Sequence, residues 1–378
     1  MAKDLSPSTY PLTPPLTEEE WHSWLRLLRS RRVGIATFFR LLEEHGDAAR
    51  ALEALPQIAA EAGVKNYQIC DEKTVSDELY RSKLAGVTPV AINSPGYPVL
   101  LAEIPNPPPI LWCVGNLDLL NKNPLAIVGA RNASSLGTRM AKRLSRDLGA
   151  ADFTIVSGLA RGVDTAAHLA ALDTGTIAVM AGGVDVIYPR ENTVLAQEIE
   201  GKGLLVSEMP VGTVPQARHF PNRNRIISGL ARTTIVVEAA AKSGSLITAR
   251  TALDQGRDVQ AVPGHPFDAR ASGCNMLIRD GATLVRSAQD VIDALEQPAR
   301  ATPKAQKAKP KAPAIPHDIA ALHAQILDRL GPSPIAEDQL IRDLSVPASA
   351  VSPEISMLEL EGKIQRQPGG LLSRAVDA

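Results

Sequence analysis

The fold is decided by residues 125–164, LAIVGARNASSLGTRMAKRLSRDLGAADFTIVSGLARGVD. Two short apolar runs in this stretch, LAIVGA and FTIVSG, flank a segment in which apolar residues recur at helical spacing. Four similar runs follow, TIAVMAG, GLLVSE, TTIVVEA and DVQAVPG, and they are again separated by helical segments. Continuous apolar strands that alternate with helices are typical of a parallel sheet covered on both faces. The sequence therefore predicts a doubly wound α/β domain.

A small helical domain is expected ahead of this α/β domain. Residues 1–16 show no apolar period, whereas Thr17 precedes three consecutive glutamates, the pattern of a helix N-cap with an acidic first turn. From 17 to 80 the apolar residues recur at helical spacing, with glycines as helix stops. We place the α/β domain at 85–296. Its first part, residues 85–115, is proline-rich and ends in an apolar strand at Gly115; we call this extended segment the lead-in.

The C-terminal part divides into a linker and a second small domain. Residues 297–316 carry five lysines and arginines and no acidic residue among alanines and prolines, which predicts an extended basic linker. Residues 317–378 show three helical segments followed by a glycine-centred hairpin, the outline of a winged helix-turn-helix. This last segment holds five basic and nine acidic residues. Its acidity argues against tight duplex binding and leaves a role in protein contacts open.

Composition excludes several classes of protein. The 378 residues carry 40 Lys and Arg against 41 Asp and Glu, so no basic field covers the whole chain. Cys70, Cys113 and Cys274 lie far apart without a CxxC pair, which argues against a disulfide framework and against a metal site. No apolar run is long enough for a membrane span or a signal peptide. We therefore expect a cytoplasmic protein with no membrane partner and no metal.

The strand ends are the place to look for a ligand, because parallel sheets bind ligands outside the carboxyl ends of their strands, beside helix N-termini that favour anions. The first strand ends at Gly129, and Arg131 follows next to an expected helix start. This arrangement suits a phosphate, although a plain turn with Arg131 on the surface is the alternative. Because Arg131 occupies the position of the second glycine of GxGxxG, we expect no dinucleotide and no other cofactor.

The second strand ends in a turn that presents another arginine. Ser157 and Gly158 precede Arg161 and Gly162, again at a helix start. Asp164 falls in the first turn of that helix, where its carboxylate is expected to cap N–H groups or to hold Arg161 in place.

Two further features near these strand ends are less specific. His168 stands one helical turn after Asp164 among alanines, which favours a packed or surface histidine over a catalytic base. The third strand ends at Gly182 and Gly183, where the backbone can approach a neighbour closely.

Two later segments add cations. The stretch 219–230, HFPNRNRIISGL, places Phe220 just ahead of Arg223, Asn224 and Arg225 at the head of an expected helix. A pair of cations with one aromatic ring is a plausible grip on a nucleotide, and a solvated charge cluster is the alternative. The turn after TTIVVEA resembles a phosphate-cradling loop but lacks the spacing of GxxxxGK[ST]; its candidate residues are Lys242, Ser243 and Ser245.

Charge is concentrated in this region. Residues 210–260 hold seven basic and three acidic residues inside a nearly neutral chain. Cations at several strand ends, without a paired acid and base or a nucleophile with a base, describe a groove for a polyanion better than a catalytic pocket. Glu208 and Glu238 also follow strands and keep an enzyme possible, but nothing in their spacing pairs them.

The ordered string IVGAR, SGLARGVD, GGVDVIYP, FPNRNRIISGL, VVEA, KSGSLITA and GRDVQAVPG resembles the DNA-processing protein A family, DprA or Smf. The resemblance is strong over 85–295. It implies an extended Rossmann-like, mostly parallel sheet that binds single-stranded DNA, forms a homodimer, and loads the RecA recombinase onto incoming DNA during natural transformation, without catalysis. The pathway does not follow from the resemblance, because similar proteins occur in bacteria not known for transformation.

The family's motifs fall on positions already selected from charge and helix ends. These positions are the G-x-R turn at Gly129 and Arg131, the SGxAxGxD signature from Ser157 to Asp164, the RN-x-x-I-x-x-L segment from Arg223 to Leu230, and the loop from Lys242 to Ser245. The segment 17–80 looks like a sterile-alpha-motif or helix-hairpin-helix module, and 317–378 resembles DNA-binding winged helices.

Two other functions stay open at this point. Related Rossmann-like folds include phosphoribohydrolases that act on nucleotides with a glycine-rich loop and a glutamate, for which Glu238 is the candidate here. A third hypothesis is an interaction adaptor whose winged helix binds protein partners. The leading prediction is a non-catalytic mediator that grips the phosphates of single-stranded DNA, assisted by N–H groups of the Ser157 and Ser243 turns.

Overall fold

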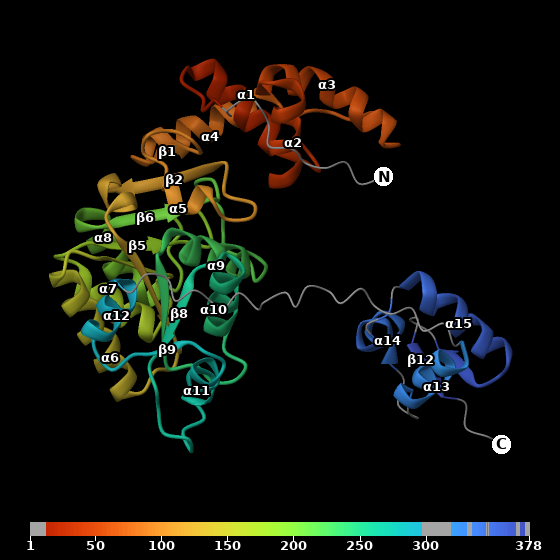
Figure 1. The fold of residues 1–378 in the computed structure, drawn as a ribbon. Helices are drawn as coiled ribbons and strands as arrows, with labels where there is room; N and C mark the ends of the chain where they lie inside the picture. Colours follow the sequence, from red (N-terminus) through yellow and green to blue (C-terminus); the bar gives the residue numbers. More distant parts are fainter. Residues whose placement is uncertain are drawn as a thin grey trace. The chain divides into compact units, whose positions relative to one another are not determined.

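The computed structural model describes residues 13–296, 319–330, 335–344, 346, 348–367 and 371–374. The chain divides into two compact units, Met1–Glu296 and Gln297–Ala378 (Figure 1). The predicted basic linker, 297–316, lies outside the described residues.

Four helices open the first unit: α1 (Glu18–Arg29), α2 (Ile35–His45), α3 (Ala48–Glu61) and α4 (Glu72–Leu84). As predicted, Thr17 is the N-cap of α1. Its side chain accepts a hydrogen bond from the N–H of Glu20, and the Glu20 side chain bonds back to the Thr17 N–H. The apolar faces of the helices meet in a core in which the rings of Trp24 and Phe38 pack edge to face, 5.2 Å apart.

The rest of this unit is built on a nine-stranded sheet with the order β1-β2-β6-β5-β4-β3-β7-β8-β9. The six predicted runs form its parallel centre, and β9 adds a further parallel strand at one edge. The strand predicted to end at Gly115 is β2, which joins the same sheet antiparallel to β6. The strands are β1 (Thr88–Ala91), β2 (Ile110–Gly115), β3 (Pro124–Gly129), β4 (Thr154–Ser157), β5 (Thr176–Val179), β6 (Leu204–Ser207), β7 (Thr233–Val237), β8 (Asp258–Ala261) and β9 (Thr283–Leu284).

Helices cover both faces of the sheet, which confirms the doubly wound fold. Because side chains alternate along a strand, Leu125 and Ile127 of β3 pack on one face with α6, α7 and α12, whereas Ala126 and Val128 face the core beneath α9 and α10. The helices of this part are α5 (Val99–Ala102), α6 (Ser135–Ala150), α7 (Val163–Ala171), α8 (Thr193–Lys202), α9 (His219–Leu230), α10 (Gly244–Asp254), α11 (Ser272–Arg279) and α12 (Ala288–Glu296), with 3-10 turns at Leu117–Asn121 and Arg190–Asn192.

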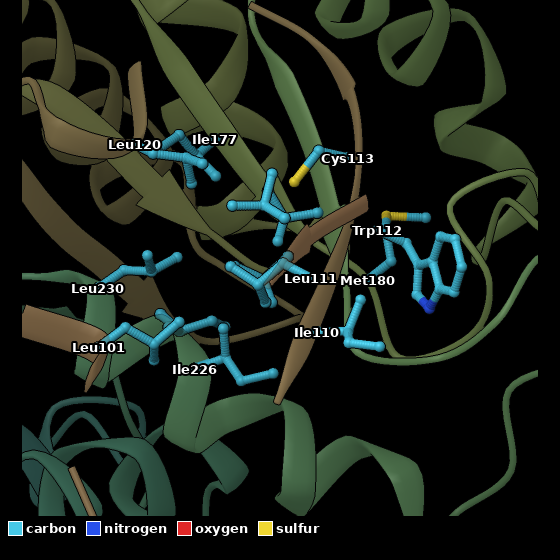
Figure 2. Packing of buried hydrophobic residues seen from close by; sticks show 14 of the residues in the cluster. Leu101, Ile110, Leu111, Trp112, Cys113, Leu120, Ile177, Met180, Ile226 and Leu230 are labelled. Atoms are coloured by element: carbon cyan, nitrogen blue, oxygen red, sulfur yellow. The ribbon is translucent and has the colours of Figure 1, made fainter. Parts of the chain in front are cut away.

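The antiparallel edge is tied to the rest of the sheet by apolar packing. Figure 2 shows Leu111 of β2 on the same side as Leu101 of α5 and Ile226 of α9, while the next residue, Trp112, points away from them. All four side chains are almost fully buried. The lead-in therefore belongs to the core of the α/β domain.

The chain reverses its direction across the sheet between β3 and β7. From β3 it proceeds through β4 and β5 to β6, and it then returns to β7 on the other side of β3. In open α/β sheets such a switch point leaves a crevice at the carboxyl ends of the two central strands. Gly129 ends β3 there, and a Cβ at this position would overlap the carbonyl oxygen of Val237 on β7.

The described part of the second unit has the three helices and the hairpin of a winged helix, as predicted. Its antiparallel strands have the order β10-β12-β11, and buried Ile326, Ile355 and Leu372 belong to its core. The elements are α13 (Ile319–Arg329), β10 (Ile335–Ala336), α14 (Glu337–Leu344), α15 (Ala348–Leu360), β11 (Ile364–Gln367) and β12 (Leu371–Arg374).

The close contact at the switch point makes Gly129 a test of the fold. We expect Gly129→Ala to lower the free energy of unfolding by about 3 kcal/mol, because the new methyl group must displace the β7 backbone. Gly201→Ala is the matched control, since no atom lies within 4 Å of a Cβ there and alanine suits the α8 helix. Urea unfolding of both variants checks this. Equal midpoints for Gly129→Ala and the unmodified chain would contradict it.

Candidate nucleic-acid interface

A cleft of about 760 Å³ lies at the switch point, at the carboxyl ends of β3 and β7 and under the first turns of α9 and α10. Eight of the fifteen predicted site residues line it: Gly129, Arg131, Phe220, Arg223, Asn224, Lys242, Ser243 and Ser245. They come from three separate segments of the chain, so the fold brings residues that are distant in the sequence together in one cleft. We call this cleft the switch-point cleft.

Positive charge dominates the switch-point cleft. Four cationic side chains line it, Arg131, Arg223, Lys242 and Arg270, against the single carboxylate of Asp164. Arg131 and Lys242 are exposed to solvent, whereas Arg223 is 5% exposed. Such a concave, one-signed lining attracts anions.

Arg223 anchors the floor of this cleft. Its Nη1 donates a hydrogen bond of 2.9 Å to the carbonyl oxygen of Val179, and its Nε has no hydrogen-bond partner among the described residues. Burial lowers the pKa of this guanidinium to about 10, and the neighbouring Asp164 opposes that shift. The group therefore stays charged at neutral pH. Gly158 is required beside it, because a Cβ there would overlap the guanidinium.

Phe220 is the aromatic ring of the cleft. The guanidinium carbons of Arg131 and Arg223 lie 5.7 and 6.0 Å from the centre of its ring, within cation–π range. Tyr188 packs on Phe220 edge to face at 5.5 Å, which supports the ring from the side. The cleft thus offers a positioned ring next to two cations.

The N-terminus of α10 provides a second kind of anion contact. Ser243 is its N-cap, and the Ser243 hydroxyl accepts from the Ser245 N–H and lies 2.7 Å from the Ser245 hydroxyl. Lys242 precedes this cap. A helix N-terminus carries partial positive charge, so the dipole of α10 and the Lys242 ammonium act in the same direction.

The turn after β4 is used internally, which corrects one prediction. The Asp164 carboxylate accepts from the N–H groups of Gly158 and Ala160, and the Leu159 N–H is bonded to His168. The Ser157 hydroxyl donates to the carbonyl oxygen of Ile127. These groups are therefore occupied, and the Ser157 turn does not offer them to a phosphate. Of the two roles expected for Asp164, capping N–H groups or holding Arg161, the structure shows the first.

Arg225 and Arg161 lie outside the cleft lining. Arg225 donates to the carbonyl oxygen of Asn106 at 2.8 Å and forms a largely buried ion pair with Glu208, whose pKa is raised by burial. Its guanidinium thus ties α9 to the lead-in, which corrects the prediction that Arg225 holds a phosphate. Arg161 is exposed, 3.5 Å from Glu191 rather than held by Asp164.

The remaining predicted glycines serve the packing of loops. Gly162 has a φ of +77°, and a Cβ there would overlap the carbonyl oxygen of Ala130. Gly182 lies against Thr213 and Gly183 against Asp185. The close approach predicted at Gly182 and Gly183 is therefore made by neighbouring loops of the same chain.

Glu238 is engaged at the start of α6. Its carboxylate accepts from the backbone N–H of Ser134 at 2.8 Å and from the Ser134 hydroxyl. It also lies so close to Gly137 that a Cβ there would overlap it. Glu238 thus neutralises the positive end of α6. Arg270, in contrast, is a cleft residue that the sequence reasoning missed, because its loop follows β8 and carries no glycine-rich signal.

No group of three or more His, Cys, Asp or Glu side chains that could hold a metal ion occurs among the residues described. Within the same residues, no helix is both long enough and apolar enough to cross a membrane.

The fold and this cleft define a Rossmann-like protein with a cationic switch-point cleft, whose chain also contains an N-terminal helical domain and a C-terminal winged helix. Three family models match the chain: DNA recombination-mediator protein A over residues 88–296, the DprA-like N-terminal HHH domain over 18–80, and the DprA winged helix domain over 308–370. The chain belongs to the DprA/Smf family of DNA recombination-mediator proteins.

Individual relatives agree with this assignment. DNA processing protein DprA of Streptococcus pneumoniae is 42% identical over 257 residues, which are 67% of this chain and 91% of the relative. Protein Smf of Escherichia coli is 38% identical over 284 residues, 74% of this chain and 76% of the relative.

Two solved structures share the fold. The X-ray structure of S. pneumoniae DprA matches with a TM-score of 0.57 at 37% identity, covering 72% of this chain and 92% of that one. The DprA of Helicobacter pylori, whose structure is described for its single-stranded DNA binding mode, matches with a TM-score of 0.51 at 30% identity, covering 55% and 95% of the two chains.

His168 yields a prediction on pH. It is fully buried, its Nδ1 lies 2.7 Å from the Thr176 hydroxyl, and its Nε2 accepts from the Leu159 N–H. Because the Thr176 hydroxyl donates to Ile155, the ring is the neutral Nδ1–H tautomer, a packed histidine as expected. Burial, with the nearby Arg223 charge, lowers its pKa to about 3.

A folded-state pKa below the unfolded value of about 6.5 means that the stability contributed by neutral His168 is present above that pH and is lost as the pH falls toward the folded value. We expect the free energy of unfolding to fall between about pH 6 and pH 4 with a contribution from His168 of up to about 1.4 kcal/mol per pH unit. Urea unfolding at several pH values should show a shallower slope for His168→Gln. Equal slopes would refute the assignment.

Proposed function

We propose that this chain binds single-stranded DNA in the switch-point cleft and, as a recombination mediator without catalytic activity, loads RecA onto that DNA in the cytoplasm. The observation that carries the proposal is the convergence of Arg131, Arg223, Lys242 and Arg270 from four segments on one cleft that holds a single carboxylate. The membership in the DprA/Smf family supports it, as does the DNA-binding relative from H. pylori.

Each part of the cleft suits one part of a nucleotide strand. The exposed Arg131 and Lys242 and the N-terminus of α10 suit phosphates, and the Phe220 ring suits a stacked base. Stacking and phosphate contacts do not read base edges, so binding should show little sequence preference. The proposed partners are RecA and a second copy of this chain, and natural transformation is the proposed pathway.

The winged helix is proposed to contact protein rather than duplex DNA. Its segment, 317–378, holds nine acidic and five basic residues, and negative charge opposes binding to a phosphate backbone.

Charge removal in the cleft tests the proposed site. We expect Arg131→Ala and Lys242→Ala each to weaken binding of single-stranded oligonucleotides by roughly tenfold at low salt and to reduce the salt dependence of the affinity, equally for different sequences. Fluorescence anisotropy across a salt series measures both quantities.

Arg40→Ala is the control for that experiment, because it removes an exposed cation from α2, outside the cleft. RecA assembly on single-stranded DNA should be accelerated by the unmodified chain and less by the two cleft variants. Unchanged oligonucleotide affinity in both cleft variants would defeat the assignment of the site.

The nucleotide-hydrolysing alternative is disfavoured by the position of Glu238. A catalytic carboxylate must be free to reach its substrate, whereas both oxygens of Glu238 accept hydrogen bonds from Ser134. We expect no release of base when the purified chain is incubated with nucleoside monophosphates and the products are separated by chromatography. Release of base that Glu238→Gln abolishes would establish the enzymatic function instead.

A further inference from the structure

A second cleft, of about 670 Å³, lies beside the switch-point cleft and is not used by the proposed function. One wall is the outer face of α6, and the other is the loop between β8 and α11, which projects beyond the sheet (Figure 1). The two clefts share no lining residue. In three segments of the chain, however, a residue that lines the switch-point cleft lies within two positions of a residue that lines the second cleft. The pairs are Asn132 and Ser134, Ala240 and Glu238, and Arg270 and Ala271. The clefts are therefore adjacent.

The α6 wall carries a basic stripe, which we define as Arg139, Lys142, Arg143 and Arg146. The spacing of three and four residues places these side chains on one face of the helix, and all four are exposed. Asp147 alone opposes them in the described ion pairs, 3.6 Å from Arg143 and 3.0 Å from Arg146. Arg139 and Lys142 form no ion pair within the described ranges. The stripe thus keeps a net positive charge.

The loop between the two clefts carries an aromatic ring at the surface. Phe267 is 96% exposed, and its ring centre lies 5.5 Å from that of His265. Arg270, three residues later, lines the switch-point cleft, whereas His265 lines the second cleft. Arg270 also forms an ion pair with Asp268 of the same loop, at 3.1 Å. An exposed ring on a loop that contributes to two clefts resembles the stacking platforms of proteins that bind a single strand.

We propose that a single strand held in the switch-point cleft continues across the Phe267 loop and is bound by the basic stripe of α6. This inference rests on the proposed function and extends it by a second contact site for the same polyanion. The adjacency of the two clefts and the exposed ring favour a single strand over an acidic protein, which would need no stacking surface. The predicted consequence is that affinity grows with strand length beyond what the first cleft can hold.

The test removes the two unpaired cations of the stripe, Arg139→Ala with Lys142→Ala. Binding of oligothymidylates of about 6 and about 20 nucleotides is measured by fluorescence anisotropy at several salt concentrations. The longer strand should bind the double variant about tenfold more weakly at low salt, with a salt slope shallower by roughly 1.4, since each phosphate contact contributes about 0.7 on a single strand. The short strand should bind both proteins equally.

One control variant and one further test variant accompany this experiment. Arg81→Ala with Lys83→Ala removes the same charge from the exposed surface of α4 and should leave both affinities unchanged. Phe267→Ala should weaken the longer strand alone, by at least about fivefold.

Equal affinity and salt slope of the longer strand for the unmodified chain and the α6 variant overturn the inference, whether or not the stripe binds an acidic protein. Failure of the unmodified chain to bind even the short strand would instead overturn the proposed function, so the two failures are distinguishable.

Discussion

The buried guanidinium of Arg223 is the interaction on which the switch-point cleft depends. A charge removed from water must be compensated by hydrogen bonds and by an opposite charge. Here the Val179 carbonyl accepts a hydrogen bond that ties α9 to β5, and the nearby Asp164 supplies an opposite charge. Asp164 at the same time caps the turn that contains Gly158. One cation thus ties α9 to the end of β5 and packs against Gly158 in the turn after β4.

This arrangement also sets the electrostatics of the cleft. Arg223 is immobilised before any ligand arrives, so its charge costs no further side-chain entropy on binding. The exposed Arg131 shares the Phe220 ring with it, and the repulsion between the two guanidinium groups contributes to the lowered pKa of Arg223. A phosphate placed between such cations relieves their repulsion. This electrostatic arrangement supports the proposal of an anionic ligand.

The sequence predicted the sheet well and the site only in part. Buried parallel strands are continuous apolar runs, and all six predicted runs are strands. Side-chain direction was not predictable: Arg223 and Arg225 are two residues apart on α9, so they point to different sides of the helix, and only packing decides which one reaches the cleft. Arg270 was missed because its contact is set by a loop that follows another strand. The domain boundaries and the site as a whole stay predictions.

The acidic side chains that follow the strands of this sheet are bonded to structural partners. Carboxylates at strand ends are the usual acids and bases of such folds, and two of them, Glu208 and Glu238, directly follow β6 and β7. Glu208 is paired with Arg225, and Glu238 is bonded to the start of α6. Asp164, the one carboxylate that lines the cleft, is committed to the turn after β4. These three carboxylates are thus held by structural partners and leave Arg131 and Lys242, which line the cleft, without an ion pair among the described residues.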